Sequence, residues 1–247
     1  MRATNHKMRR GQDGGTRPLL LVHGFASHPA CLAPLARSLG KTLGRTVVRV
    51  ALSPGREDLR RSAGVLGNLL GELAAQPGFE HADVVAHSMG GLTATYLLKK
   101  LDRGRHLRRV VTLGTPHRGT PLALLGLPAA TVCRSILQML PGSGLLGELA
   151  ALEIPTASEL VSIAGSADWL VPARFTRVAP GPGQHNLTLR GVCHTGLLTG
   201  GDTLVRVAQE LARPAQAQHV ERRSFYSSRG PGDRQMTGRN ELDSLAA

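Results

Sequence analysis

Three side chains of the sequence are those that nucleophilic catalysis uses: a serine, an aspartate and a histidine, in that order along the chain. Ser88 lies in Ala-His-Ser-Met-Gly, Asp168 in Gly-Ser-Ala-Asp, and His194 in Val-Cys-His-Thr-Gly. A serine hydroxyl is a poor nucleophile at neutral pH, so it needs a base within hydrogen-bond reach and an acidic group that orients the base. We expect Ser88 to be the nucleophile, His194 the base and Asp168 the orienting acid.

The segment around Ser88 is typical of a sharp turn between a strand and a helix. The residues two before and two after the serine must be small, because larger side chains would collide across the turn. They are Ala86 and Gly90. The familiar pattern has glycine at both positions, so Ala86 departs from it by one methyl group. His87 completes this nucleophile elbow and is expected to point away from the serine.

Acyl transfer also needs hydrogen-bond donors for the negative charge that develops on the carbonyl oxygen. Met89 follows the nucleophile, and its backbone N–H is one expected donor. The second is expected in His-Gly-Phe after the first strand, where the glycine lets the Phe25 N–H point inward. The helix that follows Ser88 adds the dipole of its N-terminus, which favours negative charge.

Other residues compete for the roles of base and acid. The chain has ten histidines, and His194 is preferred because it lies on a glycine-flanked loop between the last strand and the last helix. Asp168 directly follows its strand, although an aspartate there could instead cap a helix N-terminus. Glu159 precedes that strand and Asp202 begins the last helix, so both acids are placed less well.

The elements that must position these residues alternate between short apolar strands and amphipathic helices. Strands are predicted at 18–22, 46–52, 83–86, 109–113, 160–164 and 186–190, and helices at 30–43, 57–76, 90–101 and 201–212. This alternation predicts an α/β fold with a mainly parallel sheet of about six strands flanked by helices. Ligands of such sheets bind beyond the carboxyl ends of the strands, where the candidate residues lie.

The 247 residues divide into one folded domain and two flanking segments. Residues 1–16 are polar and glycine-rich and are predicted to be flexible, and 214–247 are predicted to form a disordered tail. The domain is expected to span 17–213. Within it, 118–158 is apolar and is expected to form one or two short helices over the site, either as a lid that opens or as a fixed cap.

Composition and charge restrict the partners. The net charge of +13 favours contact with an anionic membrane surface, although arginines spread over solvated faces would give the same value. Aromatic residues make up only 3%, too few for a base-stacking platform, so no nucleic acid partner is expected. Three widely spaced cysteines predict free thiols, and the N-terminus lacks an apolar signal segment, so we expect a cytoplasmic protein. The oligomeric state does not follow from the sequence.

Three segments together resemble bacterial lipases and esterases of the α/β-hydrolase superfamily: Leu-Leu-Leu-Val-His-Gly-Phe, Val-Ala-His-Ser-Met-Gly-Gly and Leu-Gly-Thr-Pro-His. The second is similar to minimal bacillus-type lipases. The third, extended to Arg-Gly-Thr, is similar to triacylglycerol lipases and to lipase-like relatives of GPI-inositol deacylases. The resemblance covers residues 18–212. It implies the α/β-hydrolase fold, the Ser-Asp-His triad, and hydrolysis of a small-molecule or lipid carboxylic ester through an acyl-enzyme on Ser88.

The chain also departs from larger members of that superfamily. The first predicted strand begins near the N-terminus, so the leading antiparallel hairpin is expected to be missing. No acid cluster typical of a calcium site is present, so we expect neither metal nor cofactor. Two alternatives remain open: an acyltransferase or thioesterase that uses the same triad, and a non-catalytic lipid-binding homologue.

Overall fold

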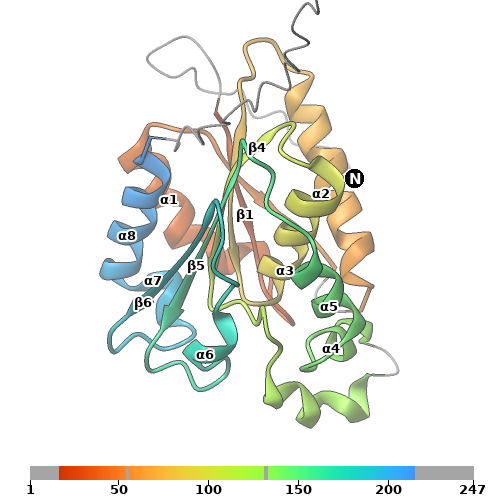
Figure 1. Ribbon diagram of the computed structural model, residues 1–247. Helices are drawn as coiled ribbons and strands as arrows, with labels where there is room; N and C mark the ends of the chain where they lie inside the picture. The colour runs from red at the N-terminus through yellow and green to blue at the C-terminus, as the bar shows by residue number, and fades with distance from the viewer. Residues whose placement is uncertain (1–16, 54–55, 131–132, 215–247) are drawn as a thin grey trace, which may run out of the picture.

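A six-stranded sheet forms the centre of the molecule, between two layers of helices (Figure 1). The computed structural model describes residues 17–53, 56–130 and 133–214, so the segment predicted to be flexible (1–16) and nearly all of the predicted tail lie outside the described residues. The strands are β1 (Leu19–Val22), β2 (Val47–Val50), β3 (Ala82–His87), β4 (Leu107–Leu113), β5 (Glu159–Gly165) and β6 (Gln184–Leu189). They pair in the order β2-β1-β3-β4-β5-β6, and all neighbouring strands are parallel.

The apolar runs of the sequence form the central strands. Every residue of β1, β3 and β5 is buried, as expected for parallel strands that are covered on both faces. The edge strands β2 and β6 are more exposed. The prediction of an α/β fold with a mainly parallel, six-stranded sheet is therefore confirmed.

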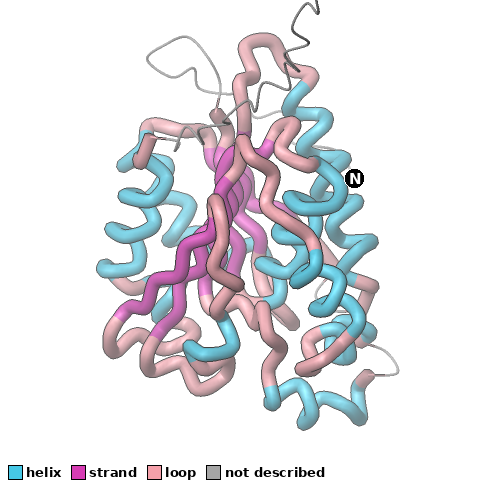
Figure 2. The backbone as a smooth tube through the Cα atoms, viewed as in Figure 1, coloured by secondary structure: helices cyan, strands magenta, loops and turns pink. Residues whose placement is uncertain are grey.

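Helices cover both faces of the sheet (Figure 2). One layer contains α1 (Ala33–Leu43), α7 (Gly196–Thr199) and α8 (Gly201–Ala212). The other contains α2 (Leu59–Ala74), α3 (Met89–Tyr96), the π-helix η2 (Leu97–Asp102) that continues α3, and α5 (Gly144–Ala151). Two short helical segments, η1 (Pro29–Leu32) and α6 (Ala173–Thr176), lie beside β1 and β2 and beside β5, respectively. Within the described residues, no helix is both long and apolar enough to cross a membrane.

Alternate residues of the strands pack into two separate hydrophobic cores, one on each face of the sheet. Leu20 and Val22 of β1 pack with α2 and α3, whereas Leu19 and Leu21 pack with α1 and α8. This division follows from the two-residue period of a strand, because successive side chains point to opposite faces. With both faces covered, the sheet is a rigid platform for the loops at its carboxyl edge.

The described residues of the apolar segment 118–158 form three helical pieces rather than the expected one or two: η3 (Pro121–Ala129), α4 (Arg134–Gln138) and α5. Gln138 ties α4 to the start of α2, because its Oε1 accepts the Leu59 N–H at 2.8 Å and its Nε2 donates to Asp58 Oδ1 at 2.7 Å. Whether the segment moves as a lid stays a prediction.

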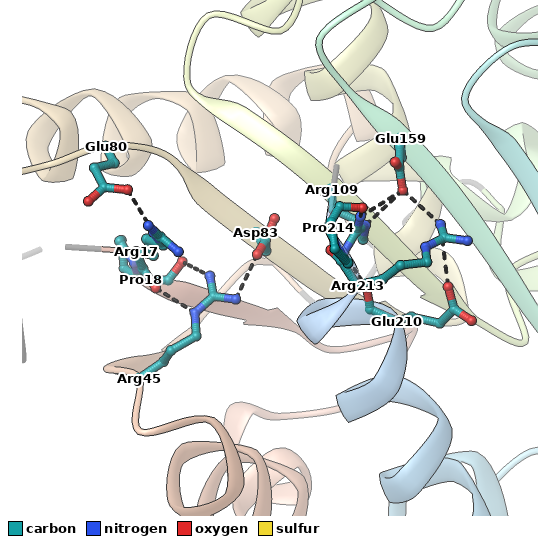
Figure 3. A network of polar contacts seen from close by, with 10 residues as sticks. All are labelled: Arg17, Pro18, Arg45, Glu80, Asp83, Arg109, Glu159, Glu210, Arg213 and Pro214. Carbon is teal, nitrogen blue, oxygen red and sulfur yellow. Dashed lines mark hydrogen bonds and ion pairs between the residues drawn. The ribbon is translucent and has the colours of Figure 1, made fainter. Parts of the chain in front are cut away.

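Arginines neutralise carboxylates at the amino ends of the strands, opposite the edge where the candidate residues lie (Figure 3). Arg45 Nη1 donates to Asp83 Oδ2 at 2.7 Å. The buried Arg109 side chain lies 2.9 Å from Glu159 Oε2 and also donates to the Glu210 carbonyl. Part of the large positive charge is therefore on arginines that form structural ion pairs.

Candidate active site

Ser88 lies in the turn between β3 and α3, at the carboxyl edge of the sheet. Its φ of 52° and ψ of −127° lie in a region that residues other than glycine seldom adopt. The Ser88 N–H donates to the Leu113 carbonyl at 2.8 Å, and Thr115 Oγ1 donates to the Ser88 carbonyl at 2.9 Å. Such a conformation costs about 1–3 kcal/mol and persists where the surroundings impose it, which is typical of functional sites.

Small residues let the neighbouring backbone approach this turn. A Cβ on Gly90 would overlap the carbonyl oxygen of His23, and one on Gly24 would lie 2.9 Å from the Cβ of Ser88. The need for a small residue two positions after the serine therefore comes from the turn that follows β1. Ala86, two positions before it, is fully buried, and its methyl group fits.

Asp168 and His194 form a buried pair beside the Ser88 turn. His194 Nδ1 lies 2.7 Å from Asp168 Oδ2, and the other carboxylate oxygen accepts the Val171 N–H at 2.8 Å. With its Nδ1–H directed to the carboxylate, the neutral imidazole has its lone pair on Nε2. Nε2 is therefore the atom of His194 that can accept a proton.

Gly114 lies against this pair, and sequence reasoning passed over it. It follows β4 with a φ of 57°. A Cβ there would lie 3.1 Å from both Asp168 Oδ2 and His194 Nδ1, and 2.9 Å from a methyl group of Leu197. A glycine directly after a strand, beside the other candidate loops, is the signal that could have identified it.

His87 supports the pair through a contact that the sequence did not reveal. Its Nε2 lies 3.1 Å from the His194 carbonyl oxygen, and the two rings lie 4.5 Å apart at 52°. Burial, and secondarily the nearby His194, lower the pKa of His87 to about 4. His87 is therefore neutral at physiological pH, donates its Nε2–H to that carbonyl, and adds no positive charge beside the His194 ring.

Ser88 and His194 line one cavity of about 430 Å³. Phe25 lines it too, and among the described residues nothing accepts a hydrogen bond from the Phe25 N–H. Met89 is the first residue of α3, so its N–H belongs to the free donors of a helix N-terminus. The rest of the wall is mostly apolar and includes Leu122, Ala123, Ile136, Met139, Leu170 and Leu198.

The described residues contain no group of three or more histidine, cysteine, aspartate or glutamate side chains that could hold a metal ion. The absence of a metal or cofactor stays a prediction. Of the competing acids, Glu159 pairs with Arg109 at the opposite edge of the sheet. Asp202 lies in the first turn of α8. The three cysteines are free thiols, as predicted.

Known proteins share this architecture. Residues 19–224 match the model of the alpha/beta hydrolase family. The chain is similar to the mature lipase BlEst2 of Bacillus licheniformis (17% identity, TM-score 0.67, 82% of this chain and 94% of that chain). It is also similar to a monoacylglycerol lipase of Paleococcus ferrophilus (15%, 0.58, 80% and 95%) and to phospholipase PlaB of Legionella pneumophila (14%, 0.66, 81% and 59%). At these identities the likeness shows the fold.

We expect the free energy of unfolding to fall as the pH drops from about 6.5 towards 4. Burial lowers the pKa of His87 to about 4, and burial together with the charge of Lys99 lowers that of His117 to about 3. In this window the unfolded chain binds more protons than the folded one, so each histidine adds a slope of up to about 1.4 kcal/mol per pH unit. Urea denaturation at several pH values measures the slope.

The matched variant for this test is His117→Gln, which removes one of the two buried imidazoles. It should make the dependence of the free energy of unfolding on pH shallower. Any further change in the free energy of unfolding that the substitution causes, measured at pH 8, should not depend on pH. A slope equal to that of the wild type would show that His117 is not held neutral in the folded protein.

Proposed function

The chain belongs to the alpha/beta hydrolase family, and we propose that it hydrolyses carboxylic esters through an acyl-enzyme on Ser88. The observation that carries this proposal is the buried 2.7 Å contact between His194 Nδ1 and Asp168 Oδ2, in a cavity that His194 shares with the strained Ser88. A fold by itself hosts many reactions. The proposal therefore depends on these three residues rather than on the likeness to lipases.

In the first half-reaction, Ser88 Oγ attacks the ester carbonyl carbon and His194 Nε2 takes the hydroxyl proton. The Asp168 carboxylate stabilises the imidazolium that forms and keeps the ring in its tautomer. The backbone N–H groups of Met89 and Phe25 are the proposed donors to the oxyanion. When the tetrahedral intermediate collapses, the C–O bond of the ester breaks and His194 returns the proton to the leaving alcohol.

Water completes the reaction by the same groups. His194 Nε2 accepts a proton from a water molecule as its oxygen attacks the acyl carbon, and the acid leaves as Ser88 regains its proton. An amine, thiol or alcohol in place of water would give acyl transfer instead. Water is the acceptor that the proposal adopts.

The cavity favours a lipid-like acyl group. Its lining is mostly apolar, with leucine, isoleucine and methionine side chains from η3, α4 and the loop before α6. Burying an acyl chain there gains about 0.8 kcal/mol per methylene. The leaving group is not specified by these contacts, so the proposed substrate class is an ester with an apolar acyl chain.

Two exposed apolar side chains lie in segments that also line this cavity, and they support contact with a lipid surface. Leu125 of η3 is 80% exposed and Trp169, before α6, is 68% exposed. The hydroxyl of Thr120 donates to the Leu170 carbonyl at 2.7 Å and joins the two segments. Exposed apolar groups next to a binding cavity are typical of lipid contact, and the net charge of +13 favours anionic lipid.

Hydrolysis of p-nitrophenyl butyrate tests the proposed chemistry. Ser88→Ala and His194→Ala should each lower kcat/KM by roughly 10⁴-fold or more, because the nucleophile or its base is lost. The matched control is Cys193→Ser, which changes an exposed thiol beside His194 and should leave turnover nearly unchanged. Folded wild-type protein without activity on butyrate, octanoate and palmitate esters would refute the proposal.

Fluorescence of Trp169, the single tryptophan of the chain, tests the lipid contact. Its emission should shift to shorter wavelength on phosphatidylglycerol vesicles, and less on phosphatidylcholine vesicles, because the indole leaves water only at a surface that attracts the protein. Leu125→Ser should weaken vesicle binding by roughly 10-fold, given the free energy of burying one leucine. Butyrate hydrolysis in solution serves as its control and should not change. An unshifted emission maximum on both lipids would contradict a lipid contact at Trp169.

A further inference from the structure

A second cavity, of about 670 Å³, lies between η2, α5 and the start of β6. It shares no lining residue with the cavity that contains Ser88. Its volume falls within the roughly 300–1,000 Å³ that small-molecule sites occupy. The proposed hydrolysis uses none of its residues, so its chemistry calls for a separate explanation.

Lys99 brings a buried ammonium to this cavity. The residue is 9% exposed, and its Nζ donates to the carbonyls of Leu149 and Leu152, both at 2.8 Å. Within the described residues, these two carbonyls are the hydrogen-bond acceptors of Nζ, and no carboxylate forms an ion pair with it. A buried cation without a counter-charge is costly, and an anion bound in the cavity would lower that cost.

The remaining charges at the cavity add to the positive potential. Arg118 and Arg177 are exposed at its lining, and Arg118 Nε donates to the Arg177 carbonyl at 3.1 Å. His117 also lines the cavity, and burial together with the positive charge of Lys99 lowers its pKa to about 3, so this imidazole is neutral and adds no charge. Glu153 is the acid among the lining residues, and it is exposed. The lining of the cavity thus carries three cationic side chains and one acidic side chain.

Most of the remaining wall is apolar. Leucine, isoleucine, valine and proline side chains line it: Leu149, Leu152, Ile154, Leu160, Val178 and Pro180. A ligand that satisfies both parts of the wall has one anionic head and an apolar chain. An inorganic anion would leave the apolar walls wet, and a neutral hydrocarbon would leave the ammonium unpaired.

The backbone at Lys99 is also irregular. After Tyr96 the helix that begins at the Ser88 turn continues as the π-helix η2, which carries Lys99 and ends at Arg103 with a φ of 52°. π-Helical turns are rare and occur frequently at functional sites. The irregular turn therefore coincides with the ammonium and with the cavity.

We propose that this cavity binds a single-chain amphiphilic anion, represented by a fatty acid, with its head on Lys99 Nζ and its chain along the apolar walls. The inference stands on this cavity and does not require Ser88 to be a nucleophile. If the chain hydrolyses acyl esters, the acid that it releases belongs to the same class. The competing explanation is that Lys99 only caps the carbonyls at the end of α5.

Isothermal titration calorimetry of the full-length wild-type protein with decanoate, decyl phosphate and decanol tests the proposal. We expect decanoate or decyl phosphate to bind at least about 10-fold more tightly than decanol, because only an anion pairs with the ammonium. The tighter of the two anions identifies the head group. No binding of either anion, or binding no tighter than that of decanol, would overturn the proposal.

Three variants locate the site. Lys99→Met keeps the alkyl chain without the charge and should weaken anion binding at least about 10-fold while leaving decanol binding unchanged. Ala179→Trp fills the exposed side of the cavity without touching Lys99 and should weaken all three ligands, so the test survives if Lys99→Met does not fold. Leu122→Trp, on the wall of the Ser88 cavity, is the matched control and should leave anion binding unchanged. The proposal would be overturned if the affinity for the anions were unchanged in both Lys99→Met and Ala179→Trp. It would also be overturned if Leu122→Trp abolished anion binding.

Discussion

The strained backbone of Ser88 is the constraint on which the candidate site depends. A residue with a Cβ is held at a φ of 52° because the end of β4 and the loop after it fix its backbone: Leu113 accepts its N–H, and Thr115 donates to its carbonyl. Gly24 and Gly90 then let the turn after β1 come close enough to form a wall of the cavity. The six parallel strands are rigid because apolar cores cover both of their faces, so they can hold this strain.

Asp168 and His194 are fixed by packing as much as by their own hydrogen bond. Asp168 uses both carboxylate oxygens, one for His194 and one for the Val171 N–H, so its position leaves little freedom. Gly114 leaves room on one side of the pair, and the neutral His87 holds the His194 backbone on the other. Preorganised groups of this kind lower the cost of forming charge during a reaction, since little has to move. The buried charge of Lys99 does not take part in these contacts, because Lys99 lines a separate cavity.

Much of the fold and part of the site could be predicted from the sequence. Continuous apolar runs such as Leu19–Val22 mark strands buried on both faces, and their carboxyl ends locate Ser88, Asp168 and His194. The contact of His87 with His194 could not be predicted, because it joins residues 107 positions apart through packing. The π-helix at Lys99 could not be predicted either, because its residues show the ordinary periodicity of an α-helix. Segment 118–158 has no clear period, and its three helical pieces are held by contacts such as that of Gln138 with α2.

The most direct test of the central claim is covalent labelling by a fluorophosphonate, followed by intact-mass and peptide-mapping mass spectrometry. We expect one adduct, on the peptide that contains Ser88, because a serine is reactive to this reagent only where a base activates it. His194→Ala should abolish the adduct while the protein stays folded, and Asp168→Asn should slow its formation by orders of magnitude. An unlabelled Ser88 in folded protein, or an adduct that forms equally fast in His194→Ala, would contradict a nucleophile activated by the His194–Asp168 pair.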